Sequence, residues 1–186
     1  MSLKNDIDSQ AVLYSKGKND ENYTPRYAVE PLLGYIPKDK VIWCPFDTDN
    51  SEFVKVFREN GYTVIASHIA TGQDFYKWEP DEHWDIMISN PPFTAKKKIF
   101  ERALSFGKPI CLLMALTWLN DSGSKVVFRD AGRDMQLLMF DNRIKFVNPF
   151  GIPNDKVTFS SGYFCSDFME KDIVLWGKLD IPKKVK

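Results

Sequence analysis

Cysteine and histidine are scarce in this sequence of 186 residues, which contains three cysteines and two histidines. Cys44, Cys111 and Cys165 are odd in number and widely spaced, a pattern that suits free thiols in a reducing cytosol. His68 and His83 add no spacing that is typical of a metal site. We therefore expect no metal centre.

The sequence also lacks an excess of charge of one sign and any long apolar run. Its 25 basic residues balance its 25 acidic residues, so no global field draws the chain onto nucleic acid, although a local basic patch can still do so. The start, residues 1–6, is polar, and no apolar run is long enough to span a bilayer. We expect a soluble cytoplasmic protein without a membrane partner.

Length and composition favour one folded domain. The hydrophobic content of 44% supports a core of ordinary size for 186 residues. Residues 1–22 are polar and rich in Lys, Asn and Asp. We predict that they form a flexible segment ahead of a single domain over residues 23–186.

Strand and helix patterns alternate along the first part of that domain. The predicted strands cover 41–44, 62–66, 85–89 and 109–115, and the predicted helices cover 27–33, 51–60 and 97–106. Ser51 is placed to cap the second helix, and Gly61 and Gly107 are placed to end helices. The alternation predicts an α/β fold with a doubly wound, mostly parallel sheet. The last third changes to short strand patterns at 135–139, 144–147, 157–159, 163–165 and 173–176.

The segment Asn90-Pro91-Pro92-Phe93 follows the predicted strand 85–89, at the edge where open α/β sheets bind ligands. It combines an amide, two stiffly held carbonyls and an aromatic ring. These groups suit methyl transfer to a conjugated amine, whose lone pair is delocalised into its ring. The Asn90 side-chain oxygen and the Pro91 carbonyl can recover that lone pair by accepting hydrogen bonds from both N–H groups, while Phe93 stacks on the base.

An ordinary turn is the alternative interpretation of this segment, because Asn-Pro commonly initiates turns. The apolar strand before it and the aromatic residue at its fourth position favour the catalytic interpretation.

The residues Ser89-Asn90-Pro91-Pro92-Phe93 resemble motif IV of S-adenosylmethionine-dependent amino-methyltransferases. Adenine-N6 DNA methyltransferases carry Asp/Asn-Pro-Pro-Tyr/Phe there, and release-factor glutamine-N5 and rRNA guanine-N2 methyltransferases carry Asn-Pro-Pro-Tyr/Phe. The resemblance implies a Rossmann-like class I fold with a C-terminal antiparallel hairpin, S-adenosyl-L-methionine as cofactor, and catalytic roles for the four residues from Asn90 to Phe93. It is specific for the reaction and weak for the substrate.

The segment Tyr23-Thr24-Pro25 resembles motif X of the same family. There a Thr-Pro precedes a helix and contacts the methionine carboxylate of the cofactor, at a helix N-terminus that suits an anion. The resemblance implies that Tyr23, Thr24 and Pro25 bind the cofactor. A plain helix cap is the alternative.

The segment 44–50 stands where the family usually carries motif I, Asp/Glu-Pro-Phe-x-Gly-x-Gly. Pro45 and Phe46 match, whereas Cys44 replaces the acid, and Thr48 and Asn50 replace the glycines that let a backbone approach the cofactor closely. The resemblance implies that Cys44, Pro45, Phe46 and Asp47 bind the cofactor. Asp47 or Asp49 would meet its methionine ammonium, and the alternative is a polar turn that caps the next helix.

Three more cofactor contacts follow from the resemblance. His68 stands near the position of the acid that binds the ribose hydroxyls, and a neutral imidazole can also bind a hydroxyl. Asp74 and Phe75, in Gly72-Gln73-Asp74-Phe75, match motif III and would meet the adenine of the cofactor. Solvated loop positions are the alternative for these residues.

The substrate we rank first is adenine N6 in DNA, with RNA bases second and protein glutamine third. An adenine in a duplex must be extruded to reach such a pocket, where Phe93 can stack on it and Phe150 or Phe159 can form the opposite wall. The basic residues 96–98 and Arg102 can touch phosphates, although solvated surface is the commoner role of such a run.

Compact adenine methyltransferases of bacteriophage and prophage origin look similar across residues 23–164. No conventional target-recognition domain is visible, so loops such as 148–160 or a partner would supply specificity. A non-catalytic module on the same fold, which binds nucleic acid or a partner, is the alternative from another class.

Overall fold

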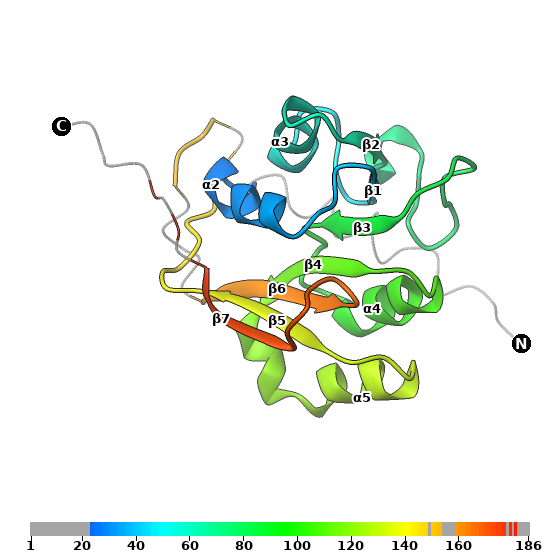
Figure 1. The fold of residues 1–186 in the computed structure, drawn as a ribbon, viewed down its shortest axis with the longest axis vertical. Coiled ribbons are helices and arrows are strands. Elements are labelled where there is room, and N and C mark those ends of the chain that lie inside the picture. The colour runs from blue at the N-terminus through cyan, green and yellow to red at the C-terminus, as the bar shows by residue number, and fades with distance from the viewer. Residues whose placement is uncertain (1–22, 149, 154–158, 178, 180, 182–186) are drawn as a thin grey trace, which may run out of the picture.

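The computed structural model describes residues 23–148, 150–153, 159–177, 179 and 181, so the segment 1–22 lies outside it. Within these residues, seven strands form one sheet in the order β2-β1-β3-β4-β6-β5-β7 (Figure 1). The strands are β1 Val41–Cys44, β2 Thr63–Ala66, β3 Ile86–Ser89, β4 Ile110–Ala115, β5 Gln136–Phe140, β6 Ser161–Ser166 and β7 Ile173–Gly177. The doubly wound α/β fold predicted from the alternation is confirmed.

The three predicted helices are present, the first as α2 Arg26–Val29 with η1 Glu30–Gly34, the second as α3 Glu52–Glu59 and the third as α4 Lys96–Ser105. The structure adds η2 Ile69–Thr71, η3 Leu116–Asn120 and α5 Ser122–Asp130, which were not predicted. The Ser51 side chain caps α3 by accepting a hydrogen bond from the Val54 N–H, and Gly61 and Gly107 follow α3 and α4 with positive φ. Helix α5 has no predicted counterpart, because it begins with Ser-Gly-Ser, a sequence more typical of turns.

The sheet is parallel at one end and mixed at the other. β1 pairs in parallel with β2 and β3, and β3 pairs in parallel with β4. β6 is antiparallel to both β4 and β5, which is the antiparallel pairing expected near the C-terminus. β6 lies inside the sheet, between β4 and β5. The edge strand is β7, which pairs in parallel with β5.

The strand pattern at 144–147 does not form a strand of this sheet. Val147 alone makes isolated bridges, to Tyr23 and to Pro153. Ile144 and Phe146 are instead buried in the core, which accounts for their alternating apolar pattern. Residues 157 and 158 of another predicted strand lie outside the described residues, and Phe159 is in a bend.

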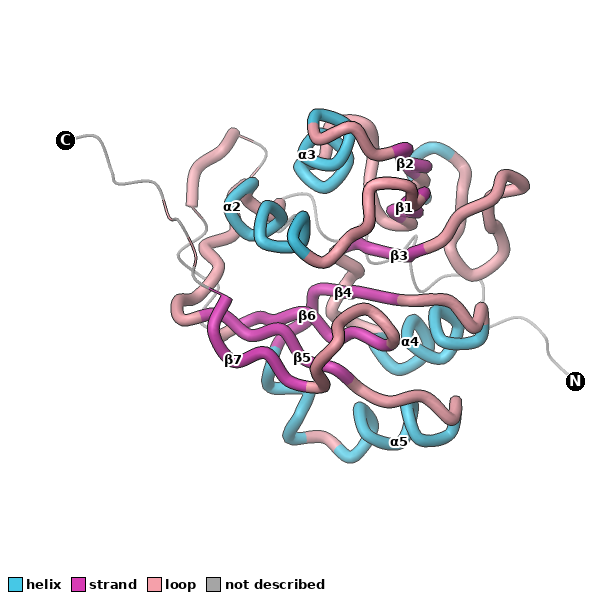
Figure 2. Tube along the Cα trace, in the orientation of Figure 1, coloured by secondary structure: helices cyan, strands magenta, loops and turns pink. Residues whose placement is uncertain are grey.

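Helices cover both faces of the sheet (Figures 1 and 2). α2 and α3 pack on one face with Cys111 and Leu113 of β4, whereas α4 and α5 pack on the other with Ile110, Leu112 and Met114. Successive side chains of a strand point to opposite faces, so a strand covered on both faces is apolar throughout. No helix in the described ranges is long and apolar enough to cross a membrane.

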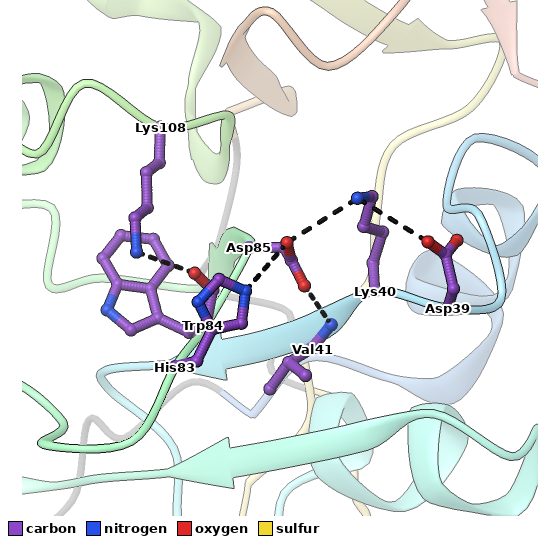
Figure 3. A network of polar contacts seen from close by, with 7 residues as sticks. All are labelled: Asp39, Lys40, Val41, His83, Trp84, Asp85 and Lys108. Carbon is purple, nitrogen blue, oxygen red and sulfur yellow. Dashed lines mark hydrogen bonds and ion pairs between the residues drawn. The ribbon is translucent and has the colours of Figure 1, made fainter.

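A carboxylate holds β1 and β3 together at their amino ends. Asp85 Oδ2 accepts a 2.8 Å hydrogen bond from the Val41 N–H, while Oδ1 lies 3.1 Å from His83 Nε2 and 3.6 Å from Lys40 Nζ (Figure 3). The Val41 amide, with smaller contributions from His83 and Lys40, lowers the pKa of the Asp85 carboxyl. The ionised carboxylate therefore stabilises the fold above its unfolded pKa of about 4, and this stabilisation is lost as the pH falls through the lower folded pKa.

We expect Asp85→Ala to lower the free energy of unfolding at pH 7 by about 2 kcal/mol, because it removes a charged acceptor and leaves the Val41 N–H unpaired. Urea unfolding measures the change. The matched control is Asp39→Ala, because Asp39 is mostly exposed and its ion pair with Lys40 is long, at 3.7 Å. This substitution should lower the free energy of unfolding by less than about 0.5 kcal/mol. If both substitutions lowered the free energy of unfolding equally, Asp85 would not hold β1 and β3 together as described.

Candidate active site

The strand order reverses between β1 and β3. From β1 the chain crosses to β2 on one side, and from β3 it crosses to β4 on the other. The chain therefore leaves the carboxyl ends of β1 and β3 in opposite directions along the sheet, and open α/β sheets bind ligands at such a position. The loops that leave these ends are residues 45–50 and 90–95, the two segments that resemble motifs I and IV.

Ser89, the last residue of β3, joins the two loops. Its hydroxyl donates to Asp47 Oδ2 and accepts a 3.2 Å hydrogen bond from the Phe46 N–H. The Asp47 N–H in turn donates to the Ser67 carbonyl after β2, at 3.1 Å, and the Ser67 hydroxyl accepts from Trp43 Nε1. The first loop is thus held against the ends of both neighbouring strands.

Asp47 is a buried carboxylate at this edge of the sheet, with 6% of its surface exposed. Burial raises the pKa of its carboxyl to about 6, although hydrogen bonds from Ser89 and Ser51 act in the opposite direction. A carboxylate kept in a site that destabilises its charge is typical of a functional position. A cationic ligand beside Asp47 would favour the ionised form.

Two buried oxygen atoms of the predicted site have no hydrogen-bond partner. They are Asn90 Oδ1, directly after β3, and Thr24 Oγ1, before α2. Pro25 occupies the N-cap position of α2, which has no side-chain cap, so Thr24 does not serve as a plain helix cap. Buried polar atoms without partners are rare, and an absent ligand is one physical reason for them.

Aromatic rings surround the end of the Asn90 segment. The half-buried ring of Phe93 lies 5.5 Å from that of Phe159 and 6.2 Å from that of Phe146, while Phe150 is 84% exposed. Of the two residues considered for the wall opposite Phe93, the structure places Phe159 beside it. Ala95 follows with φ 55, a strained conformation for alanine that sharply separates this loop from α4.

The first loop contains one aromatic residue, Phe46. Its half-buried ring lies 4.7 Å from that of Phe75, which is only 2% exposed and packs in the core. Phe46 therefore offers the more accessible ring for a ligand. The Cys44 side chain is fully buried in the core on the α2 and α3 face, and its backbone carbonyl accepts from the Ser67 N–H.

The loop after β2 holds the remaining cofactor candidates in turns. His68 Nδ1 accepts a 3.1 Å hydrogen bond from the Ala70 N–H. A neutral imidazole that accepts at Nδ1 carries its proton on Nε2. Asp74 Oδ1 accepts from the Tyr76 N–H at 3.0 Å. Both interactions shape the loop, and the Asp74 carboxylate keeps its second oxygen for another donor.

The basic run after Phe93 has partners within the protein. Lys96 lies 2.9 Å from Asp121, and Lys97 lies 3.6 Å from Glu101. Arg102 donates to the Phe75 and Trp78 carbonyls. These contacts favour a structural role for Lys96 and Arg102 over phosphate binding.

Sequence patterns placed Ser89 in the segment that resembles motif IV but gave no role at the site to Ser89, Ser67 or Phe146. Ser89 gives the clearest signal, because a polar residue at the end of the buried strand Ile-Met-Ile-Ser needs a hydrogen-bond partner. Phe146 gives no signal beyond its place in an apolar pattern, because it contacts Phe93, a residue that is distant in sequence.

Solved methyltransferase structures are similar to this chain at low sequence identity. A modification subunit assigned to a type I restriction enzyme from Vibrio vulnificus YJ016 has a TM-score of 0.52 and 10% identity, over 95% of this chain and 51% of that chain. Precorrin-6y C5,15-methyltransferase from Geobacter metallireducens GS-15 has a TM-score of 0.42 and 12% identity, over 80% and 94% of the two chains. The release-factor-specific glutamine-N5 methyltransferase from Alicyclobacillus acidocaldarius has a TM-score of 0.42 and 13% identity, over 76% and 93%.

The sheet topology, together with the likeness to the modification subunit, gives this chain the Rossmann-like fold of methyltransferases. The chain spans about half the length of that subunit. No protein-family model and no curated protein matches the sequence.

We expect Asp47→Asn to raise the free energy of unfolding by about 1–3 kcal/mol at pH 8. The folded pKa of Asp47 lies above the unfolded value, so the folded state holds a proton that the unfolded state releases between about pH 4 and 6. Wild-type stability therefore falls as the pH rises through that window. The increase in the free energy of unfolding caused by Asp47→Asn should be complete above about pH 6 and absent below about pH 4.

Urea unfolding between pH 4 and 8 measures this difference. Asp49→Asn is the matched control, because Asp49 is exposed in its 2.8 Å ion pair with Arg58 and should show no such pH-dependent gain. Equal stability of wild type and Asp47→Asn at pH 8 would show that burial of the ionised Asp47 does not lower the free energy of unfolding.

Proposed function

We propose that this chain is an S-adenosylmethionine-dependent methyltransferase that acts on an exocyclic amino nitrogen, with adenine N6 in DNA as its substrate. The observation that carries this proposal is Asn90 Oδ1, a buried acceptor without a partner at the carboxyl end of β3. It belongs to the Asn-Pro-Pro-Phe segment, which ends in the half-buried Phe93. An orphaned acceptor at this position suits a ligand that brings an N–H group.

The target amine would bind between two acceptors. Asn90 Oδ1 accepts one N–H, and the Pro91 carbonyl accepts the other. Both hydrogen bonds draw the amine away from planarity and direct its lone pair out of the ring plane. Pro91 and Pro92 keep these acceptors in place, and Phe93 stacks on the base, so most of the rate enhancement comes from positioning.

The cofactor would lie across the loops after β1 and β2. When bound, S-adenosylmethionine supplies an electrophilic methyl group. The buried Thr24 hydroxyl has no partner and can donate to its carboxylate, while Asp47 can bind its ammonium group. Phe46 offers a ring surface, and we assign the ribose to His68 and the adenine amine to Asp74.

A flipped base could stack on the ring of Phe93. The Phe159 ring lies 5.5 Å away at an angle of 58°, so it would have to turn and move to cover the other face of the base. A DNA substrate also agrees with the restriction-enzyme modification subunit that shares the fold. Sequence specificity would come from the loop at 148–160 or from a partner.

Isothermal titration should detect binding of S-adenosylmethionine to the wild-type protein. Thr24→Val, which keeps the shape and removes the hydroxyl, should weaken binding about tenfold, the effect of losing one hydrogen bond to a charged group. Thr63→Val is the control, because Thr63 is exposed at the start of β2, at the opposite edge of the sheet from the candidate site. Absence of heat and of a thermal shift at millimolar cofactor would contradict the enzyme and favour a non-catalytic module.

Transfer of a tritiated methyl group to separate pools of DNA, RNA and protein tests the substrate. We expect label in DNA adenine, with Asn90→Ala lowering the rate at least 100-fold because one of two positioned acceptors is lost. Asn90→Asp, which keeps an acceptor, should retain measurable transfer, and the exposed Asn142→Ala should match wild type. Undiminished counts in Asn90→Ala would remove Asn90 from the mechanism, and counts in RNA or protein alone would replace the DNA assignment.

A further inference from the structure

Two cysteines face each other across the antiparallel strands β4 and β6. The register pairs Cys111 with Cys165, and both side chains are free thiols that are fully buried. Both belong to the part of the core that packs with α2 and α3, so they point to the same face of the sheet. Opposed side chains on one face of an antiparallel pair are in contact. The two thiols are therefore neighbours, although they are distant in the sequence.

The hydrogen-bond pattern of the two strands sets the distance between the paired residues. The Leu116 N–H donates to the Ser160 carbonyl at 2.9 Å, which makes these opposed residues a hydrogen-bonded pair. Hydrogen-bonded and non-hydrogen-bonded pairs alternate along an antiparallel ladder, so Cys111 and Cys165 form a non-hydrogen-bonded pair. The Cα atoms of such a pair lie about 4.5 Å apart, within the range of about 4.4–6.8 Å that a disulfide bridges.

The third cysteine, Cys44, lies in the same row of the sheet but out of reach. Ile88 of β3 is paired with Cys111 of β4. The register of β1 and β3, continued by one residue from Trp43 and Met87, places Cys44 on the other side of Ile88. Two strand spacings separate Cys44 from Cys111 by about 9–10 Å, beyond the limit of about 7 Å for a disulfide. The fold thus selects one of the three pairings that three cysteines allow.

Burial decides when this pair can react. Burial raises the pKa of the Cys111 thiol well above its ordinary value, and the neighbouring Cys165 thiol raises it further. The thiolate is the form that attacks an oxidant, and both strands lie inside the sheet. The folded protein therefore shields the pair, whereas a chain that is still folding brings the two thiols together while they remain accessible to small oxidants.

We propose that Cys111 and Cys165 are a disulfide site, which closes when the chain folds in the presence of a low-molecular-weight disulfide. The thiolate of one cysteine attacks the small disulfide and forms a mixed disulfide, with release of one small thiolate. The second cysteine attacks the protein sulfur of that intermediate, forms the internal bond and releases the second small thiolate. The cysteine pair is oxidised, the small disulfide is reduced, and the two thiol protons pass through water to the released thiolates.

The cross-link would join the two halves of the sheet. β4 belongs to the parallel half, and β6 holds β5 and β7 beside it. A disulfide that closes a long loop restricts the unfolded chain and so stabilises the fold. The protein would have two forms of one fold, a dithiol form and a more stable oxidised form, according to the conditions under which it folds. Both the bond and its effect are independent of the proposed methyltransferase activity.

Refolding in a glutathione buffer tests the site. Urea-unfolded protein is diluted into buffer with an excess of oxidised over reduced glutathione. Free thiols are then labelled with N-ethylmaleimide in fresh urea, and the peptides are identified by mass spectrometry. We expect a monomer with the single disulfide Cys111–Cys165 and with the label on Cys44. Its Tm should exceed that of the dithiol protein by about 5–10 °C, because the closed loop restricts the unfolded chain.

Cys44→Ala is the matched control, because Cys44 is equally buried on the same face of the sheet. It should keep both the disulfide and the rise in Tm, whereas Cys111→Ala should lose both. Wild type oxidised in urea shows the pairing without the fold. There Cys44–Cys111 and Cys111–Cys165 close loops of similar length and should form in similar amounts.

Three outcomes would overturn the disulfide site. They are a refolded protein in which all three cysteines carry the label, a mixture of pairings like that obtained in urea, and disulfide-linked dimers in place of the internal bond. An internal bond that leaves Tm unchanged or lowers it would overturn the more stable oxidised form. If a variant aggregates on refolding, the peptides of wild type still show which pair has closed.

Discussion

The hydroxyl of Ser89 makes the contact on which the rest of the site depends. It donates to Asp47 and accepts from the Phe46 amide, and so joins the loops that leave β1 and β3. This junction holds a buried carboxylate and the segment that begins at Asn90 at the same edge of one sheet. Sites built on rigid elements keep their geometry more precisely than sites on free loops.

The loops that leave the carboxyl ends of β1 and β3 each hold a buried polar group that the protein itself does not fully stabilise. Asp47 is a buried acid whose charge is disfavoured, and Asn90 Oδ1 is a buried acceptor without a donor. Each condition costs folding free energy in the ligand-free protein. A cation at Asp47 and an N–H group at Asn90 would relieve both costs. Two of the energetic weak points of the fold are therefore positions that a cationic cofactor and an amine substrate would occupy.

Local patterns in the sequence were sufficient for most of the architecture. The apolar runs of β1, β3 and β4 and the caps at Ser51 and Gly107 are local signals, and the structure follows them. Helix α5 was missed because its Ser-Gly-Ser start conceals a short apolar face that packs only in the folded protein. The stretch 144–147 alternates like a strand because Ile144 and Phe146 fill the core, not because they pair in the sheet.

The site was less predictable because its contacts join distant segments. The motif at Asn90 was recognisable from its own residues, whereas the bond from Ser89 to Asp47 spans 42 positions and leaves no local pattern. The choice of Phe159 over Phe150 beside Phe93 likewise depends on how the chain folds back after β5. Sequence reasoning identified which groups carry chemistry, and the fold decided which of them meet.

The carboxylates at the two ends of β1 and β3 respond oppositely to acid. Asp85, at the amino ends, has a lowered pKa and stays ionised in mild acid, while Asp47, at the carboxyl ends, has a pKa of about 6. Mild acidification would neutralise the carboxylate that faces a ligand before it affects the one that holds the strands. A fall in pH through about 6 would therefore progressively neutralise the carboxylate at the carboxyl ends of the strands, while the carboxylate that joins their amino ends stays ionised.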